Sequence, residues 1–337
     1  MTTTDILAEV TRGRRTESHH VGSVVFADPN GGLLGAVGNR QGSIFPRSAI
    51  KIIQALPLIE CGGADRFNFT PTELALACGS HSGTSEHAAV ADAILQRIGL
   101  NKNSLACGSH APLDILSQYD LIRTGQAISP LHNNCSGKHI AMLATALHLG
   151  DSLEDYELAH HDVQRRIRNA VAEVTETELS NVAPGIDGCS LPNWPIPLES
   201  LAIAVARIAS SQGFHQSRQN AFERLLSACW EKPEAMSGTG RFDTVMLQQF
   251  PGDVFVKGGA EGVYCGGFRK LGIGFALKIN DGAQRAAETA VRAIIARFAK
   301  GAESLAEPTI LKNARGTAVG DIRPGAALMK VLERIQV

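Results

Sequence analysis

The sequence predicts an α/β protein of the α+β kind, with a mixed, mainly antiparallel sheet, flanking helices and a separate helical lobe. Strand-like apolar runs lie toward both ends of the chain, and apolar residues at helical spacing dominate the middle. Hydrophobic residues make up 44% of the 337 residues and charged residues 19%, enough for a sizeable core. We expect residues 1–60 and 236–337 to form the sheet lobe, residues 61–235 the helical lobe, and both to contribute to one active site.

The first strands read as a hairpin. His20–Ala27 is rich in valine, Asp28–Gly32 has the chemistry of a turn, and Leu33–Val37 resumes the apolar pattern. After it, Ser48–Leu56 predicts a short helix whose far end is disturbed by Pro57.

The spacing of apolar residues predicts five helices and three strands, and a further helix near the C-terminus. The helices are expected at Thr84–Ile98, Ser136–Leu149, Ala159–Val174, Pro197–Ser211 and Ser217–Trp230. The strands are expected at Asp253–Lys257, Gly262–Cys265 and Gly272–Ile279, followed by the helix Ala283–Ala299.

Composition excludes several classes of function. Lys and Arg number 32 against 33 Asp and Glu, so the chain has no general basic field to hold nucleic acid. Uncharged stretches are shorter than the roughly 18–20 residues that a membrane helix needs. The polar residues 1–20 and the seven scattered cysteines predict a cytoplasmic protein with free thiols.

Ser48 and Lys51 form a Ser-x-x-Lys motif. If a helix begins at Ser48, the two side chains lie one turn apart on the same face. A desolvated lysine there can take the serine proton, which makes the hydroxyl a nucleophile. The same pattern also suits a serine that caps a helix, followed by a solvated lysine.

Two further segments fit this chemistry. In penicillin-recognising serine hydrolases, Ser-x-x-Lys is joined by Lys-Thr-Gly on a strand. Here a strand runs into Lys257-Gly258-Gly259, where an N–H group is available as an oxyanion donor. The loop Cys78–Gly83 presents Ser80 to a cleft, although an ordinary edge lysine and an ordinary Ser/Gly loop would look the same.

Cysteines suggest a metal site. Cys135 and His139 are spaced i, i+4, and Cys189 is a second thiol bounded by glycine. Two thiolates and a nitrogen ligand suit zinc, with water at the fourth position. Two buried cysteines without a metal fit the same spacing, because no Cys-x-x-Cys pair is present.

Six ordered motifs together resemble the rhizobial-type (class 3) L-asparaginases of the asparaginase II family. They are Arg47-Ser48-x-x-Lys51, Cys-Gly-Ser80-His-Ser-Gly, His-Asn-Asn-Cys135-Ser-Gly-Lys-His, Asp187-Gly-Cys189, Gly240-Arg-Phe-Asp-Thr and Lys257-Gly-Gly-Ala-Glu-Gly. The resemblance spans about residues 18–335. It implies a fold similar to serine β-lactamases and glutaminases, a homodimer, and hydrolysis of L-asparagine to L-aspartate and ammonia.

The resemblance also implies the site. It pairs Ser48 with Lys51 and Ser80 with Lys257 as catalytic residues, and it makes Cys135, Lys138 and Cys189 the ligands of a zinc ion that helps to position substrate. This disagrees with the spacing argument, which prefers His139 as the nitrogen ligand. We follow the family and expect His139, with Asp187 and Arg47, to bind the substrate. Gly258 stands where the penicillin-recognising pattern has threonine, so Arg47 is expected to hold the carboxylate.

Other functions stay open at this point. A zinc-dependent amidohydrolase would use the metal to activate water. A related glutaminase-like serine hydrolase would take a substrate one methylene longer. A protein that only binds zinc or a small molecule would leave both Ser–Lys pairs without a purpose.

Overall fold

The computed structural model describes residues 5–336 and divides into two compact units. The sheet unit consists of the residues up to Ala49, Ile196–Gly213, and the residues from Gly252 onward. The helical unit consists of Ile50–Pro195 and Phe214–Pro251. The sequence predicts a sheet lobe of residues 1–60 and 236–337 and a helical lobe of residues 61–235. In the structure, Ile196–Gly213 from the middle of the chain also belongs to the sheet unit.

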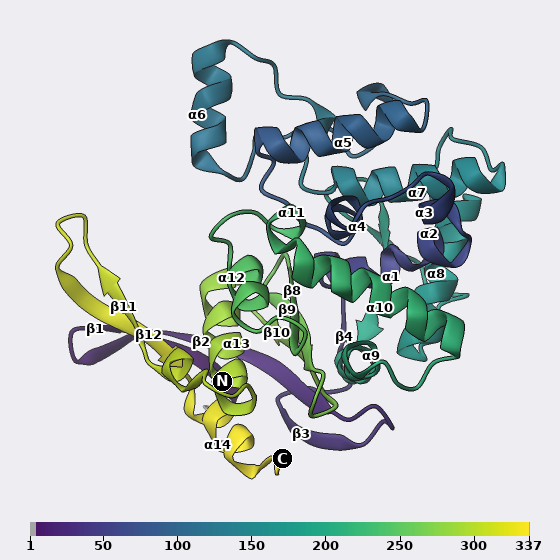
Figure 1. Ribbon diagram of the computed structural model, residues 1–337. Helices are drawn as coiled ribbons and strands as arrows, with labels where there is room; N and C mark the ends of the chain where they lie inside the picture. The colour runs from purple at the N-terminus through teal and green to yellow at the C-terminus, as the bar shows by residue number, and fades with distance from the viewer. Residues whose placement is uncertain (1–4, 337) are drawn as a thin grey trace. The chain divides into compact units, whose positions relative to one another are not determined.

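The sheet unit is built on an eight-stranded sheet. Its strands are β1 (Ile6–Arg12), β2 (Arg15–Ala27), β3 (Leu33–Val37), β8 (Val254–Gly259), β9 (Val263–Phe268), β10 (Ile273–Ile279), β11 (Thr309–Lys312) and β12 (Ala318–Pro324). They run in the order β11-β12-β1-β2-β10-β9-β8, with β3 also paired to β2. Purple β1 and yellow β12 are neighbours in Figure 1, so the two ends of the chain meet in one sheet.

Helices cover both faces of the central strands. Gly274 lies against α9 (Leu198–Ser210), where an added Cβ would meet the Ala202 carbonyl oxygen at 2.3 Å. Its neighbour Phe275 faces the other way, because side chains alternate along a strand. Phe26 pairs with Phe275 in register and packs edge-on against Phe298 of α13 (Gln284–Phe298), with ring centroids 6.0 Å apart. Thus α9 and α13 cover opposite faces.

The remaining elements of this unit are peripheral. α14 (Ala326–Arg334) packs on β3 and β1, and η5 (Glu303–Ala306) packs on α13. The short strands β4 (Ser43–Ile44) and β7 (Ile196–Pro197) pair with each other. All strand pairings found in residues 5–336 are antiparallel. The mainly antiparallel character and the α+β class are confirmed, whereas the parallel pairs of a mixed sheet are absent from these residues.

The helical unit surrounds α7 (Ser136–Leu149), in which every residue from Ser136 to Ala146 is buried. α7 contacts α2, α3, α4, α5 and α8. It approaches α4 so closely that a Cβ on Gly137 would lie 2.3 Å from the Leu76 carbonyl oxygen. The other helices of the unit are α1 (Lys51–Gln54), α2 (Leu56–Glu60), α3 (Gly63–Arg66), α4 (Pro71–Ala77), α5 (Ser85–Arg97), α6 (Ile115–Thr124), α8 (Asp162–Thr175), α10 (Gln216–Glu231), α11 (Pro233–Met236) and α12 (Phe242–Gln249).

The predicted helix Ser48–Leu56 forms as three short pieces. The 3₁₀ turn η2 (Arg47–Ile50) leads into α1, and α2 begins immediately afterward at Leu56. Pro57 lies in the first turn of α2, where its missing N–H is harmless. The proline therefore starts a helix here, whereas the sequence suggested that it disturbs the end of one.

The five helices expected in the middle of the chain and the last helix are present, each within a few residues of the expected ends. Within residues 5–336, no helix combines the length and the apolar character needed to cross a membrane.

Candidate active site

Lys51 is completely buried at the first position of α1 and makes a dense set of polar contacts. Its Nζ lies 2.8 Å from Ser80 Oγ and 3.2 Å from the carbonyl oxygen of Asn134. It also contacts the Gly79 carbonyl oxygen, and Cys135 Sγ at 3.2 Å. A lysine so far from water needs such partners, because burying an unpaired amine is costly.

Ser80 is held in place by the backbone around it. It follows α4 in the chain, and its N–H donates to the Met236 carbonyl oxygen at 2.9 Å. Gly79 has no room for a side chain, since an added Cβ would lie 2.6 Å from the same oxygen. The segment 78–80 can therefore pass close to the 236 backbone only with glycine at position 79.

The contacts of Lys51 are suited to proton transfer. A neutral amine has two N–H donors and one lone pair. As an ammonium, the form whose charge lowers the pKa of Cys135, Lys51 offers its N–H donors to these polar neighbours. Its Nζ lies 2.8 Å from Ser80 Oγ, within the distance that proton transfer requires once the amine is neutral.

The first turn of α7 carries two of the predicted metal ligands. Cys135 is the N-cap residue, and Lys138 lies in the following turn with its Nζ 3.4 Å from Cys189 Sγ. All three side chains are buried. Cys189 lies in the loop of a tight hairpin formed by β5 (Gly185–Ile186) and β6 (Pro192–Asn193).

The two thiols are tightly coupled. A side-chain hydrogen bond from Cys189 holds the pKa of the Cys135 thiol well below its usual range, helped by the positive charges of Lys51 and Lys138. That same hydrogen bond, with burial, raises the pKa of Cys189. The contact between the two thiols and the nearby amines therefore favours the ionised form of Cys135 over that of Cys189. Burial lowers the pKa of Lys138, but the cysteines and Asp187 outweigh it, so the net shift is upward.

The donor set suits zinc. A tetrahedral zinc with Zn–S about 2.3 Å and Zn–N about 2.0–2.1 Å separates its sulfur and nitrogen ligands by about 3.5 Å. The distance from Lys138 Nζ to Cys189 Sγ is 3.4 Å. Within residues 5–336, no three His, Cys, Asp or Glu residues group together to hold a metal, so a zinc ion here depends on the lysine as third ligand. Lys138 must lose its proton to bind, so the metal has to displace a proton that the cysteines and Asp187 hold on the amine.

His139 and Asp187 flank this cluster. His139 is fully buried, and its Nδ1 lies 2.6 Å from the hydroxyl of Tyr156. Burial, with the charges of Lys138 and Lys51, holds the pKa of His139 well below its usual value, so its ring is neutral. Asp187 lies in the β5–β6 loop, where its N–H donates to the Leu191 carbonyl oxygen at 2.8 Å.

The remaining predicted residues belong to the sheet unit. Lys257 of β8 is buried, and its Nζ donates to the Gly258 carbonyl oxygen at 2.9 Å. Gly259 faces the same side of the strand and lies against residues 46–49, where a Cβ would be 2.8 Å from the Pro46 carbonyl oxygen. Within this unit, β8 is therefore packed against the segment that carries Arg47 and Ser48. Ser48 is half-buried in η2, and Arg47 has a left-handed backbone, with φ of 52°.

The structure groups several of the predicted residues within each unit, in contacts that differ from the pairs the motifs suggested. Within the helical unit, the structure brings Lys51, Ser80 and Cys135 together, and it places Lys138 beside Cys189. The Lys51–Ser80 hydrogen bond was not expected, because the motifs paired each of these residues differently. The Ser48–Lys51 and Ser80–Lys257 pairs remain predictions. Tyr156 was missed, since nothing in its sequence neighbourhood marks it.

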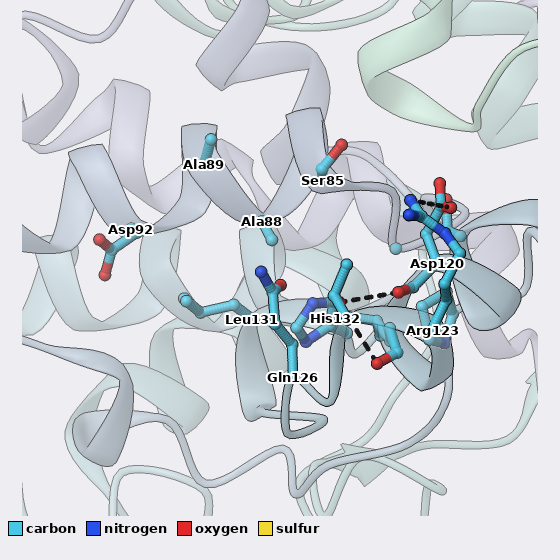
Figure 2. Close-up of a pocket in the computed structure, with 14 residues that line it drawn as sticks. Ser85, Ala88, Ala89, Asp92, Asp120, Arg123, Gln126, Leu131 and His132 are labelled. Carbon is cyan, nitrogen blue, oxygen red and sulfur yellow. Dashed lines mark hydrogen bonds and ion pairs between the residues drawn. The ribbon is translucent and has the colours of Figure 1, made fainter.

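A pocket of about 470 Å³ lies elsewhere in the helical unit, beside α5 and α6. Figure 2 shows Ala88, Ala89 and Asp92 on its α5 side, with His132 and Arg123 across from them. None of the predicted catalytic, substrate-binding or metal-binding residues lines it. The chemistry of the cluster is therefore separate from this pocket.

Comparison with protein families identifies the family of the chain. A model of the L-asparaginase II family matches residues 8–324, nearly the whole chain. None of the curated proteins compared with the chain matches it. A match of this extent shows the family and its chemistry on amides, whereas it leaves open which residues carry out the reaction. The chain therefore belongs to the L-asparaginase II family and is an amidohydrolase with L-asparaginase activity.

Proposed function

We propose that the protein hydrolyses L-asparagine to L-aspartate and ammonia through a serine nucleophile and an acyl-enzyme. The observation that carries the proposal is the 2.8 Å contact between the buried amine of Lys51 and the hydroxyl of Ser80. A lysine so placed can move a proton to and from serine hydroxyls without a histidine.

In the first half of the reaction, Ser48 Oγ attacks the side-chain amide carbon of asparagine and gives its proton to Lys51. Backbone N–H groups stabilise the negative charge on the amide oxygen, and residues 258–260 supply candidates for this role. The carbon–nitrogen bond then breaks. Ammonia leaves with the proton that Lys51 accepted, relayed through Ser80 and Lys257, and a β-aspartyl ester remains on Ser48.

In the second half, a water molecule attacks the ester and gives a proton to the same relay. The ester bond breaks, Ser48 regains its proton, and L-aspartate leaves. His139 and Asp187 bind the carboxylate and the ammonium of the substrate, and Arg47 assists with the carboxylate. These roles rest on the motifs and on the cluster within the helical unit.

The nucleophile is tested with Ser48→Ala and Ser80→Ala, each compared with wild type by rapid-quench kinetics and peptide mass mapping. Ser48→Ala should abolish both turnover and the acyl adduct. Ser80→Ala should still form the adduct on Ser48 and release product slowly. An adduct mapped to Ser80, or a folded Ser48→Ala protein that retains more than about a few per cent of kcat, would assign the nucleophile to Ser80.

We further propose that Cys135, Lys138 and Cys189 hold zinc. The metal, when bound, would supply a fixed positive charge that orients the substrate. Soft thiolate ligands reduce its Lewis acidity, which favours positioning over activation of water. The competing zinc-dependent amidohydrolase is supported by the same donor set, and it predicts that a chelator abolishes kcat, whereas positioning predicts a higher KM with kcat largely kept.

Selectivity for asparagine over glutamine is a separate measurement. One extra methylene typically changes binding by only about 1–3 kcal/mol. A glutaminase-like enzyme would therefore show kcat/KM values for the two amides within about tenfold of each other. An asparaginase should favour asparagine by more than this.

We also propose that the protein is a cytoplasmic homodimer. Its seven cysteines are all free thiols, as expected in a reducing compartment. Analytical ultracentrifugation and cell fractionation test the two parts separately. A monomer at micromolar concentration would contradict the homodimer, and recovery from a secreted fraction would contradict the cytoplasmic location.

A further inference from the structure

Tyr156 makes two hydrogen bonds through one hydroxyl group. The side chain is buried, with 2% of its surface exposed. Its oxygen accepts from the N–H of Ala106 at 2.9 Å and lies 2.6 Å from Nδ1 of His139. The two rings meet edge to face, with centroids 5.6 Å apart. The hydroxyl therefore lies between a backbone donor and the imidazole.

The direction of the second bond follows from the hydrogens available. The phenol has one hydrogen, and the Ala106 N–H occupies an acceptor position on its oxygen. Within residues 5–336, the only other partner of this hydroxyl is Nδ1 of His139. If Nδ1 carried a proton and donated, the phenol hydrogen would be buried without an acceptor. The phenol must therefore donate, and Nδ1 accepts through its lone pair.

Because Nδ1 of His139 accepts a hydrogen bond, the protonation of Nε2 on the other side of the ring follows. A neutral imidazole that accepts at Nδ1 carries its hydrogen on Nε2. Nε2 of His139 is buried and makes no well-formed hydrogen bond to the described residues, although the ring also interacts with the Cys189 backbone, which favours a hydrogen on the ring. The opposite tautomer would leave two groups unsatisfied, the phenol hydrogen and the Nε2 lone pair. The observed arrangement leaves one, a donor.

We propose that Tyr156 is a positioning residue that holds His139 as a neutral Nε2–H donor, ready for an acceptor oxygen of the substrate. The inference rests on the proposed role of His139 in binding asparagine. The acceptor we expect is a carboxylate or amide oxygen, because these are the acceptor groups that asparagine carries. A buried, unpaired donor strongly favours a ligand that supplies the missing acceptor and disfavours one that lacks it.

The same tautomer bears on the metal site. Nε2 carries hydrogen, so it has no lone pair to offer a metal, and Nδ1 is occupied by Tyr156. This hydrogen-bond arrangement disfavours His139 as the third ligand, although its i, i+4 spacing from Cys135 suggested that role. Lys138, with Nζ 3.4 Å from Cys189 Sγ, is left as the nitrogen donor.

The tautomer is read directly by nuclear magnetic resonance. The full-length protein is labelled with ¹⁵N in its histidine rings, and long-range ¹H–¹⁵N spectra distinguish protonated from unprotonated ring nitrogens. The His139 signals are identified by their loss in His139→Gln. In wild type we expect Nε2 protonated and Nδ1 unprotonated. In Tyr156→Phe we expect a mixture of tautomers, because the donor to Nδ1 is gone.

Kinetics separate positioning from packing. Tyr156→Phe should raise KM for L-asparagine by about 3- to 10-fold with kcat within about twofold, since a binding contact is weakened in ground and transition states alike. In a His139→Gln background the same substitution should leave KM unchanged, because the glutamine amide carries its N–H in any case. Tyr156→Phe also removes the hydroxyl that accepts from the Ala106 N–H. This loss occurs in both backgrounds, so it cancels when the two KM ratios are compared.

Tyr119→Phe is the matched control, since it removes a phenol hydroxyl from the exposed face of α6. It should change neither the His139 signals nor KM. A wild-type spectrum with the proton on Nδ1 would overturn the proposal. So would an equal rise of KM for Tyr156→Phe in both backgrounds. If the wild type fails to hydrolyse asparagine, the proposed function fails, but the spectrum still decides the tautomer.

Discussion

Lys51 and Ser80 lie 29 positions apart in sequence, yet the amine and the hydroxyl are 2.8 Å from each other in the helical unit. The contact depends on three separate pieces of backbone. The carbonyl oxygens of Gly79 and Asn134 accept from the same amine, and α1 supplies the lysine. Because these acceptors are fixed main-chain atoms, the position of Nζ is set before any substrate arrives.

Replacing this amine should remove activity while largely preserving the shape of the site. Lys51→Met keeps the length and apolar stem of the side chain but cannot exchange a proton. We expect kcat to fall by about 10²–10⁴-fold, the usual contribution of a general base, or more if the nucleophile depends on it. Ammonia release measures the effect, and circular dichroism checks the fold.

Lys270→Met is the control, because Lys270 is exposed and pairs only at the surface with Asp253. It should leave kcat unchanged. Turnover by folded Lys51→Met within tenfold of wild type would show that the lysine is not the base.

The close approach of α7 to α4 predicts a stability effect at Gly137. In Gly137→Ala, the new Cβ would lie 2.3 Å from the Leu76 carbonyl oxygen, and neither backbone can move far within a packed core. We expect a loss of about 1–3 kcal/mol in the free energy of unfolding. The first turn of α7 would shift with it, so KM should rise as well. Urea denaturation and steady-state kinetics measure the two effects.

Gly188→Ala provides the comparison, since an added Cβ there meets nothing within 4 Å. It lies one residue from Cys189, yet its stability should equal that of wild type. Equal stability of the two variants would show that α7 and α4 can separate without cost.

The sequence predicted the central strands and the main helices because their apolar residues recur at a clear period. β2 and β10 carry continuous buried runs, and α8 has a strong apolar face. β1 and β12 were not predicted. β12 contains Gly320, Asp321 and Arg323 and is buried only at Ile322, so its alternation is weak. Its place in the sheet comes from pairing with β1, which single-sequence patterns do not report.

α6 was also missed, although a signal was present. Asp114 accepts from the Ser117 N–H as an N-cap, and Ile115, Tyr119 and Ile122 recur at helical spacing. No residue of α6 is buried, so its apolar positions do not resemble those of a core helix. Here the cap was the better guide than hydrophobicity.

For the site, sequence motifs singled out candidate residues but not the contacts between them. Lys51, Ser80 and Cys135 were each singled out by local context. Their mutual contacts depend on how α1, α4 and α7 pack together, and the spacing of residues along the sequence does not predict that packing. Tyr156 is a single tyrosine in a loop 17 positions after His139, and only the folded structure shows that its hydroxyl reaches the imidazole.

Removing one thiol should separate metal binding from folding. Cys189→Ser replaces a soft sulfur ligand by a weakly coordinating hydroxyl, so zinc content should fall by at least about tenfold. KM should rise with kcat largely retained if the metal orients substrate. Cys61→Ser, at a half-buried thiol outside the cluster, should keep its zinc. Equal metal content in both variants, measured by elemental mass spectrometry, would exclude Cys189 as a ligand.

The stacked rings of His81 and His87 predict how stability depends on pH. Their centroids are 4.8 Å apart, and burial holds the pKa of each ring below its usual value, so both are neutral when folded. Hydrogen bonding agrees: Nδ1 of His81 accepts from the Gly83 N–H at 3.1 Å, and Nε2 of His87 lies 2.9 Å from the Glu234 carbonyl oxygen.

Below about pH 6.5 the unfolded chain binds protons that the folded rings refuse, so the free energy of unfolding should fall as pH falls and level off above pH 7.5. Each histidine contributes up to roughly 1.4 kcal/mol per pH unit, or roughly 2–3 kcal/mol for the pair between pH 7.5 and 5.5. His87→Gln retains a donor for the Glu234 carbonyl and should reduce the measured difference by about 1.4 kcal/mol, the share of one histidine. His215→Gln, at an exposed ring, should leave it unchanged. Urea titrations at the two pH values measure the difference, and a pH-independent wild type would mean that the rings are charged or exposed when folded.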